Sequence, residues 1–248
     1  MGDAIRPLIE ISGVRKVFEG KLVHRDVDLA IYPGEILTLM GGSGSGKSVL
    51  LRSIIGLEKP DHGRIEFHGD NIVGMNEQEL VEVRKKIAYV FQYGALFDSL
   101  TVKENLAYPL RAHTQLTEPE IHDRVLSTLG KVGLQGCEEM YPSGLSGGMQ
   151  RRVGVARSII MEPEVILYDE PTTGLDPYNT KQILKNIVSL KEQGATSVLV
   201  THDMSSIFAV TDRVAFLRDG VIIAVGTAAE IRDSDDAGVS GFINGETL

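Results

Sequence analysis

The chain lacks the features that build disulfides, thiolate metal sites and membrane spans. Its 248 residues include a single cysteine, Cys137, and no tryptophan. One cysteine excludes an intrachain disulfide and a zinc site built from several cysteines, and it favours a reducing compartment. The longest stretch without Asp, Glu, Lys or Arg has 11 residues, for example residues 36–46, whereas a membrane-spanning helix needs about 20 apolar residues.

An export signal and a basic surface are also missing. Residues 1–6 do not have the basic-then-apolar layout of a signal peptide, and Arg6 breaks the myristoylation pattern that Gly2 would begin. The sequence therefore predicts a cytoplasmic protein. The 25 Lys and Arg residues against 34 Asp and Glu residues give a net charge of −9. This balance argues against a protein that follows a nucleic-acid backbone, because such proteins need a basic face.

The hydrophobic pattern predicts an α/β protein. Residues 27–31 alternate like a half-buried strand, whereas residues 36–40 are nearly all apolar, which is typical of a strand covered on both faces by helices. Further strands are predicted at residues 8–11, 87–91, 165–168 and 197–200, with helices between them. We therefore expect a mainly parallel sheet with an N-terminal antiparallel β part and an inserted helical subdomain at about residues 102–160.

Local signals predict the ends of several elements. Thr117 and Glu120 fit a capping box at the start of a helix with proline in its first turn. Asp219-Gly220 predicts the tight turn of a hairpin within residues 214–223. Residues 233–248 mix acids, glycines and an exposed-looking Phe242, and we expect them to form a loosely ordered C-terminal tail.

The strongest chemical signal is a glycine-rich loop between an apolar strand and an apolar helix. Residues 41–48 read GGSGSGKS, which matches the phosphate-binding P-loop. Glycines let backbone N–H groups converge on a phosphate, and the helix N-terminus adds its positive dipole end. Lys47 would bring a positive charge to the β- and γ-phosphates, and Ser48 would offer its hydroxyl to Mg²⁺. The predicted nucleotide-binding residues are Gly41, Gly42, Ser43, Gly44, Ser45, Gly46, Lys47, Ser48 and Val49.

Two adjacent carboxylates follow the predicted strand at residues 165–168. At the carboxyl edge of a parallel sheet they would lie near the P-loop, and alternation along the strand sends them in different directions. Asp169 would then hold Mg²⁺ through water, while Glu170 would be the general base for an attacking water or would orient it. The alternative is an ordinary strand end with solvated acids.

A second candidate phosphate cradle lies further along the chain. Ser146, Gly147 and Gly148 open an apparent helix that carries three arginines, an arrangement that favours anions at its N-terminus. A single nucleotide does not need two cradles from one chain. We therefore expect two chains to face each other, each supplying the second cradle for its partner's ATP.

Taken in order, these motifs resemble those of the ATP-binding subunits of ATP-binding-cassette (ABC) transporters. The P-loop is followed by Gln92, by the LSGG segment at residues 145–148, by Asp169-Glu170, by Asp176 and by His202. The resemblance covers about residues 8–230. It implies one nucleotide-binding domain over residues 1–248, a P-loop NTPase of ABC ATPase type with a helical signature subdomain. Such a domain hydrolyses ATP with Mg²⁺, and a membrane permease holds it on the cytoplasmic face of the inner membrane.

The resemblance also implies roles for single residues. Gln92 resembles the glutamine that contacts Mg²⁺ or the attacking water, and His202 resembles the histidine that contacts the γ-phosphate. Asp176 resembles an aspartate that crosses the dimer interface. Phe18 resembles the aromatic residue that stacks on adenine, although a core aromatic is the alternative. The five other histidines have no motif and are expected on the surface: His24, His62, His68, His113 and His122.

Two positions depart from the family pattern. Met149 stands where the family usually has glutamine, so a polar contact to nucleotide or to neighbouring backbone is either missing or made by Gln150. Gly42 stands where proline is frequent, which should loosen the loop without removing its function.

The LSGGM segment and residues 91–102 are similar to the branch of the family that serves Mla/Mce-type phospholipid transport between inner and outer membranes. This similarity implies a homodimer whose partners are an integral membrane permease, a STAS-type accessory subunit and an MCE-type lipid-binding protein. The net charge of −9 predicts that nucleic acid is not a partner. Ala95, Leu96 and Phe97 follow Gln92 where the family docks a permease helix, and a buried core segment is the alternative.

Two other functions stay open at this point. An ABC ATPase for another cargo, such as an amino acid or a metal, would carry the same motifs. A non-transport cytosolic ABC ATPase that acts on DNA or ribosomes is disfavoured, because the chain has no heptad array, a single P-loop and a net charge of −9.

Overall fold

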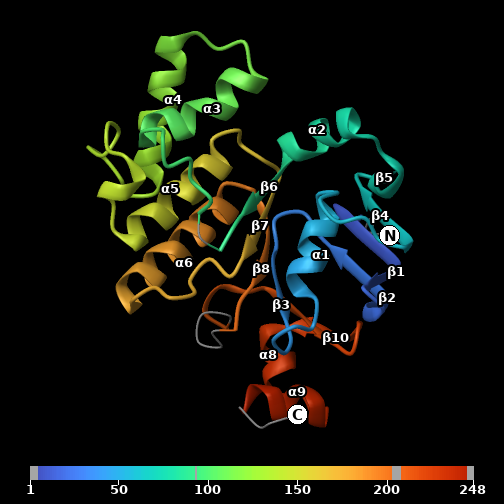
Figure 1. Cartoon of the computed structure of the whole chain (residues 1–248). Coiled ribbons are helices and arrows are strands. Elements are labelled where there is room, and N and C mark those ends of the chain that lie inside the picture. The colour runs from blue at the N-terminus through green and yellow to red at the C-terminus, as the bar shows by residue number, and fades with distance from the viewer. Residues whose placement is uncertain (1–4, 93, 203–207, 245–248) are drawn as a thin grey trace.

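The computed structural model describes residues 5–92, 94–202 and 208–244. The N-terminal part of the chain forms an antiparallel sheet, seen at the right of Figure 1. Its strands are β1 (Ile9–Phe18), β2 (Lys21–Ile31), β4 (His62–Phe67) and β5 (Asp70–Asn71), and they lie in the order β2-β1-β4-β5. The antiparallel β part expected at the N-terminus is therefore confirmed.

A second, six-stranded sheet occupies the centre of the molecule. Its strands are β3 (Ile36–Met40), β6 (Ile87–Val90), β7 (Val165–Asp169), β8 (Thr196–Val200), β9 (Arg213–Arg218) and β10 (Val221–Thr227). They lie in the order β10-β9-β3-β8-β7-β6, and all neighbours are parallel except the β9–β10 hairpin. The prediction of a mainly parallel sheet is confirmed.

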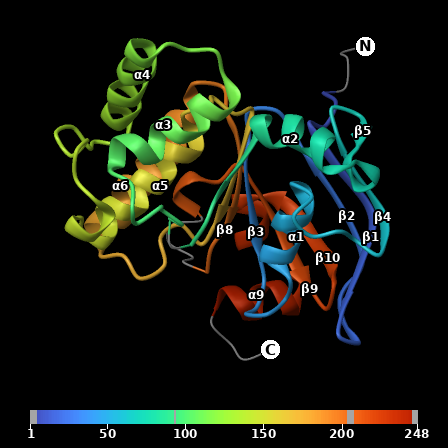
Figure 2. The same cartoon turned by 45° about the horizontal axis from the view of Figure 1, so that its top comes forward.

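The helices of the described residues lie on both faces of the central sheet and in the insertion after β6. In chain order they are α1 (Lys47–Ile54), α2 (Glu77–Lys86), α3 (Val102–His113), α4 (Glu118–Lys131), α5 (Gly147–Ile159), α6 (Pro177–Glu192), α8 (Ala228–Arg232) and α9 (Ala237–Ile243). Figure 2 shows α1 between the central sheet and the antiparallel sheet, with α5 and α6 on the other side. Among the described residues, none of these helices is long and apolar enough to cross a membrane.

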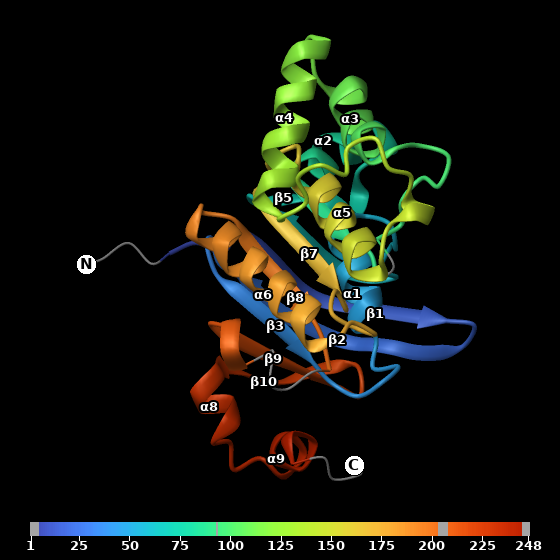
Figure 3. The ribbon, with the colours of Figure 1, turned by 90° about the vertical axis from the view of Figure 1, so that its left-hand side faces the viewer.

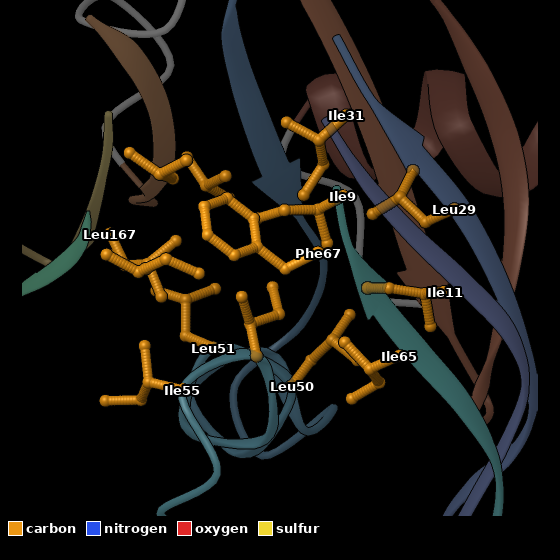
Figure 4. Close-up of a cluster of buried hydrophobic side chains, with 14 of the residues drawn as sticks. Ile9, Ile11, Leu29, Ile31, Leu50, Leu51, Ile55, Ile65, Phe67 and Leu167 are labelled. Carbon is orange, nitrogen blue, oxygen red and sulfur yellow. The ribbon is translucent and has the colours of Figure 1, made fainter. Parts of the chain in front are cut away.

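The main hydrophobic core lies between the two sheets and surrounds α1. Figure 4 shows Leu50 and Leu51 of α1 pointing into a cluster that also holds Ile9 and Ile31 of the antiparallel sheet and Leu167 of β7. All these side chains are buried. Burial of this apolar area fixes the start of α1, and with it the glycine-rich loop, relative to the central sheet.

Residues 102–160 hold helices α3, α4 and α5 together with connecting loops, and they contain no strand. Figure 3 shows α3 and α4 standing away from the antiparallel sheet, with α5 leading back toward the central sheet. Leu106, Val125 and Val153 join a second core that also covers the α6 face of the sheet. The expected helical insertion in the α/β body is thus present.

The local signals at element ends are confirmed. The Thr117 backbone N–H donates to Glu120 Oε2 at 2.7 Å at the start of α4. Asp219 and Gly220 connect β9 to β10 with φ values of 49° and 78°, a left-handed turn that matches the twist of a hairpin.

The expectation of a loosely ordered tail is wrong for Ala237–Ile243, which forms α9. Asp236 Oδ1 caps this helix by accepting from the backbone N–H groups of Gly238 and Val239. Phe242 is half-buried, with its ring edge-on to Phe216 at a centroid distance of 5.1 Å. The apolar residues of the tail therefore have a core to pack on, and residues 245–248 lie outside the described residues.

A close backbone contact joins α5 to the loop after β6, and it yields a prediction. A Cβ at Gly154 would lie 2.7 Å from Gly94 Cα, so Gly154→Ala should lower the free energy of unfolding by about 1–3 kcal/mol. Gly130→Ala in α4 is the matched control. Its Cβ would meet only Gln135 at 3.6 Å, so it should stabilise by about 0.5–1 kcal/mol. Urea denaturation measures both, and a Gly154→Ala chain as stable as wild type would contradict the packing.

Candidate active site

A cavity of about 670 Å³ lies at the carboxyl ends of the central strands. The glycine-rich loop forms most of its wall, and Glu170 and His202 line it from the ends of β7 and β8. Val23 of β2 and Phe242 of α9 complete the lining. Backbone donors, a lysine, a carboxylate and a histidine thus converge on one space, as the order of motifs predicts.

Lys47 is the buried cation of this cavity. Its Nζ donates to the carbonyl oxygens of Gly41 and Gly42, both at 2.9 Å, so the ammonium lies against the loop. Burial lowers the pKa of Lys47, and the carboxylates of Glu170 and Asp169 oppose this shift. The two acids therefore favour the charged lysine that phosphate binding needs.

The P-loop serine and the first of the two acids contact each other directly. Ser48 Oγ donates to Asp169 Oδ1 at 2.7 Å, and Tyr89 OH donates to Asp169 Oδ2 at 2.7 Å. Burial is the main cause that raises the pKa of Tyr89, and the contact with Asp169 raises it further. The hydroxyl therefore stays protonated and acts as a donor. A hydroxyl and one carboxylate are hard oxygen ligands that suit Mg²⁺, which usually takes its remaining ligands from water and phosphate. Sequence reasoning missed Tyr89, whose only signal was its place in a buried strand.

The second acid, Glu170, meets the predicted histidine. Glu170 Oε2 lies 3.0 Å from His202 Nδ1 and accepts from Thr173 Oγ1 at 2.5 Å. The Glu170 backbone N–H donates to Val200 O at 2.9 Å, and the residue has a φ of 50°. Non-glycine residues rarely adopt this left-handed conformation, and it turns Glu170 out of the strand direction. Sequence reasoning did not identify Thr173, which fixes one carboxylate oxygen.

The predicted signature residues lie outside this cavity. Ser146 caps α5, accepting from the Met149 backbone N–H at 3.3 Å, and it is exposed together with Gly147. Gly148 is buried against α6, because a Cβ there would lie 2.4 Å from the Asn179 side chain. The N-terminus of α5 is therefore presented to solvent rather than to the phosphate loop of its own chain.

Asp176 lies beside the signature residues and is also exposed. It caps α6: its Oδ1 accepts from the Asn179 backbone N–H at 2.9 Å, and its Oδ2 accepts from Asn179 Nδ2 at 2.6 Å. These hydrogen bonds lower the pKa of Asp176. Asn179 thus connects the predicted interface aspartate to Gly148.

Gln92 and Phe18 are not among the residues that line the cavity. Gln92 follows β6 and is half-buried. Phe18 ends β1 and is half-buried, with Lys16 Nζ over its ring at 4.7 Å from the centroid. The roles expected for these two residues therefore stay predictions.

The departure at position 149 has a structural counterpart. The Met149 side chain packs against the second hydrophobic core. Gln150 Nε2 donates to the backbone oxygens of Pro142 at 2.8 Å and Leu145 at 3.3 Å. The polar contact to neighbouring backbone is thus made by Gln150, as one of the two alternatives expected.

One histidine expected on the surface is buried. His24 has an exposed fraction of 0%, and its Nε2 lies 3.1 Å from Gly46 O at the end of the phosphate loop. The expectation of a surface position is wrong for His24, because β2 packs against this loop. The local sequence pattern does not predict this long-range contact. The remaining histidines without a motif are exposed: His62, His68, His113 and His122.

A second, mostly apolar groove of about 420 Å³ lies between the central sheet and α3. Phe97 and Tyr108 line it with exposed fractions of 45% and 56% and with ring centroids 5.3 Å apart. Leu96 instead packs against the second core, as the buried-core alternative expects, and docking at Phe97 stays a prediction. Tyr93, which belongs to the same segment, lies outside the described residues.

Below these rings, two side chains hold the backbone of the segment. Arg157 Nη2 donates to Ala95 O at 2.7 Å, and Asn105 Nδ2 donates to Phe97 O at 3.1 Å. Asn105 has an exposed fraction of 0%. The groove is therefore built on a fixed backbone.

Comparison with known sequences agrees with this geometry. The family described as "ABC transporter" matches residues 24–173. The intermembrane phospholipid transport system ATP-binding protein MlaF of Escherichia coli K12 is 39% identical over 246 residues, which cover 99% of this chain and 91% of that protein. The probable ribonucleotide transport ATP-binding protein mkl of Mycobacterium tuberculosis is also 39% identical, over 97% of this chain and 67% of that protein.

Solved structures give the same result for the fold. A dimeric, post-hydrolysis structure of the ATP-binding cassette MJ0796 bound to ADP and Pi has a TM-score of 0.83 and 32% identity, and it covers 89% of this chain and 98% of that one. A second dimeric structure of MJ0796, described as a bacterial ABC transporter cassette, has the same scores. The sequence match, the fold and the converging motifs together show that this chain belongs to the ABC transporter family, as an ATP-hydrolysing subunit.

Proposed function

We propose that the chain is the ATPase of a phospholipid transporter of the Mla/Mce type, acting as a homodimer that closes around two Mg·ATP. The observation that carries this proposal is the separation of the two phosphate cradles. The P-loop, Glu170 and His202 line one cavity, whereas the exposed N-terminus of α5 lies outside it. In this proposal residues 1–248 form one nucleotide-binding domain, and residues 102–160 are its signature subdomain.

The phosphate loop would bind the triphosphate. The N–H groups at the start of α1 have no partner within the helix, and residues 41–49 can direct them at phosphate oxygens together with the Lys47 ammonium. Ser48 and Asp169 would hold Mg²⁺, with Gln92 approaching from the end of β6. When bound, Mg²⁺ neutralises negative charge on the phosphate oxygens.

Glu170 would accept the proton of the attacking water or orient that water. Thr173 and His202 both contact its Oε2, which leaves Oε1 as the oxygen that neither residue holds. His202 is more than half exposed, so its ring is accessible to a γ-phosphate. Positioned charge around the transferred phosphoryl group supplies most of the rate enhancement in this type of reaction.

The second cradle would come from another copy of the chain. Ser146 and Gly147 are exposed at a helix N-terminus, whose dipole favours anions, and exposed Asp176 lies on the neighbouring helix end. A closed dimer would place these groups against the partner's ATP. ATP that bridges the two chains would shift the population from open to closed dimers. Hydrolysis would remove this bridge and return the population to the open form.

The apolar groove beside Phe97 and Tyr108 would receive a helix of the permease. Exposed apolar side chains that gather in one groove favour a protein interface. Docking there would hold the ATPase on the cytoplasmic face of the inner membrane. A STAS-type accessory subunit and an MCE-type lipid-binding protein belong to the same proposal, because the resemblance to the Mla/Mce branch implies them.

The cargo assignment rests on relatives. The MlaF proteins of E. coli and Haemophilus influenzae, named for phospholipid transport, each match this chain over 91% of their own length. The mkl relative, named for ribonucleotide transport, has the same sequence identity, but this chain matches only 67% of its length. Phospholipid is therefore the favoured cargo, and a nucleotide cargo is the second candidate. Lipid co-extracted with the native complex in mild detergent distinguishes them.

Replacement of Glu170 tests the catalytic assignment. Glu170→Gln should bind ATP and accumulate as a dimer, while its steady-state ATPase rate falls by about 10²–10⁴-fold, the usual contribution of a general base. Phosphate release measures the rate, and light scattering measures the dimer. Glu192→Gln, an exposed acid at the end of α6, is the matched control and should hydrolyse ATP like wild type. Wild-type turnover by Glu170→Gln would remove Glu170 from this role.

Replacement of an exposed apolar residue tests the docking groove. Phe97→Asp places a charge in the groove, so it should abolish co-purification with the integral membrane permease while ATP binding persists. Leu126→Asp on α4, which alters another exposed apolar residue outside the groove, should co-purify like wild type. Permease recovered equally with Phe97→Asp and with Leu126→Asp would contradict docking at this groove.

A further inference from the structure

His24 is a buried polar residue that neither the motifs nor the family resemblance assigns. It lies in β2, directly under the end of the phosphate loop, with none of its surface exposed. Its Nε2 lies 3.1 Å from Gly46 O, and its Nδ1 is buried without a hydrogen-bond partner among the described residues. Buried polar atoms usually have partners, so an unpaired one requires an explanation.

Gly46 and the imidazole fit each other closely. Gly46 has a φ of 100°, and a Cβ on it would lie 2.7 Å from both His24 Nε2 and Val23 Cγ1. Val23 itself lines the nucleotide cavity. Only glycine can occupy this position without displacing the histidine. Strand β2 therefore supports the phosphate loop from below at the point where α1 begins.

The hydrogen bond from His24 acts on the first peptide of α1. Gly46 O also accepts from the Leu50 N–H at 2.9 Å, so both of its lone pairs are used. The C=O and N–H of a trans peptide point in opposite directions. Holding the Gly46 carbonyl consequently fixes the direction of the Lys47 N–H, one of the donors at the helix N-terminus that have no intrahelical partner.

The surroundings of His24 determine which of its nitrogens carries the proton. Burial lowers the pKa of His24; the Gly46 carbonyl opposes the shift, and the nearby Lys16 ammonium adds to it. Lys16 is the cross-strand neighbour of His24 in the β1–β2 pair. A carbonyl can only accept, so the neutral ring must carry its proton on Nε2. Nδ1 is then a buried acceptor without a donor, an arrangement that lowers the stability of the fold.

We propose that His24 is a positioning residue for the nucleotide: its Nε2–H holds the Gly46 carbonyl so that the Lys47 N–H is already directed at the phosphate when ATP arrives. This inference rests on the proposed function, since it assumes that the cavity binds ATP. The buried Nδ1 destabilises the fold, whereas the hydrogen bond from Nε2 holds the phosphate loop in place before ATP binds. A loop that is already ordered loses less conformational entropy on binding, so ATP binds more tightly.

Two kinds of replacement separate this role from a structural one. His24→Leu and His24→Met fill the space but remove the donor, whereas His24→Gln keeps an N–H donor near the position of Nε2. With the fluorescent analogue mant-ATP and Mg²⁺, the full chain carrying His24→Leu or His24→Met should bind about 3–10-fold more weakly, the worth of one neutral hydrogen bond. His24→Gln should restore binding to within about twofold of wild type. The loss should appear in KM rather than in kcat.

Unfolding in urea without nucleotide supplies the readout that a structural role would change. The unpaired Nδ1 disappears in His24→Leu and His24→Met, so their midpoints should equal or exceed that of wild type. Wild-type mant-ATP affinity in both apolar variants would overturn the inference. Equal weakening in His24→Gln and His24→Leu would also overturn it, because the donor would then be irrelevant.

Lys47→Ala in the same titration keeps the inference separate from the function on which it rests. Loss of mant-ATP binding in Lys47→Ala is expected if the cavity is the nucleotide site. Retained binding in Lys47→Ala would refute the cavity assignment itself. Lost binding in Lys47→Ala together with wild-type binding in His24→Leu and His24→Met would refute only the role of His24.

Discussion

The arrangement of the site depends on the two carboxylates at the end of β7. Asp169 accepts from Ser48 and Tyr89, which ties the sheet edge to the phosphate loop. Glu170 turns away through a left-handed backbone and contacts His202 and Thr173. Because β7 ends at Asp169 and the chain turns at Glu170, the two side chains reach different partners, and in the proposed mechanism one strand end supplies both a metal ligand and a base.

The same geometry leaves a second helix N-terminus away from the cavity of its own chain. Helix α1 presents its N-terminus to the cavity, while α5 presents its N-terminus to solvent next to Asp176. The Asn179 side chain packs against Gly148 and donates to Asp176 Oδ2, so the start of α5 and the start of α6 are in direct contact. In the proposed cycle these two helix starts meet the partner's ATP.

Motifs with strong local chemistry could be predicted from the sequence. Residues 36–40 are buried along their whole length as β3, and the loop at residues 41–48 follows where the pattern puts it. Glu170 and His202, 32 positions apart, lie in contact, because the carboxyl ends of parallel strands lie along one edge.

Features that depend on packing between distant segments could not be predicted. His24 has no local signal for burial, since only the passage of β2 under Gly46 removes it from solvent. Tyr89 and Thr173 acquire their roles from contacts with the two acids. Helix α9 packs Phe242 against Phe216, a contact that composition alone does not reveal.

The central claim is that one chain is catalytically incomplete and that each ATP is bound between two chains. Phosphate release measured across a range of chain concentrations, with light scattering on the same samples during turnover, tests it most directly. The rate per chain should rise with the dimer fraction and approach zero for the monomer. A sample that stays monomeric throughout turnover and hydrolyses ATP at the full rate per chain would contradict it.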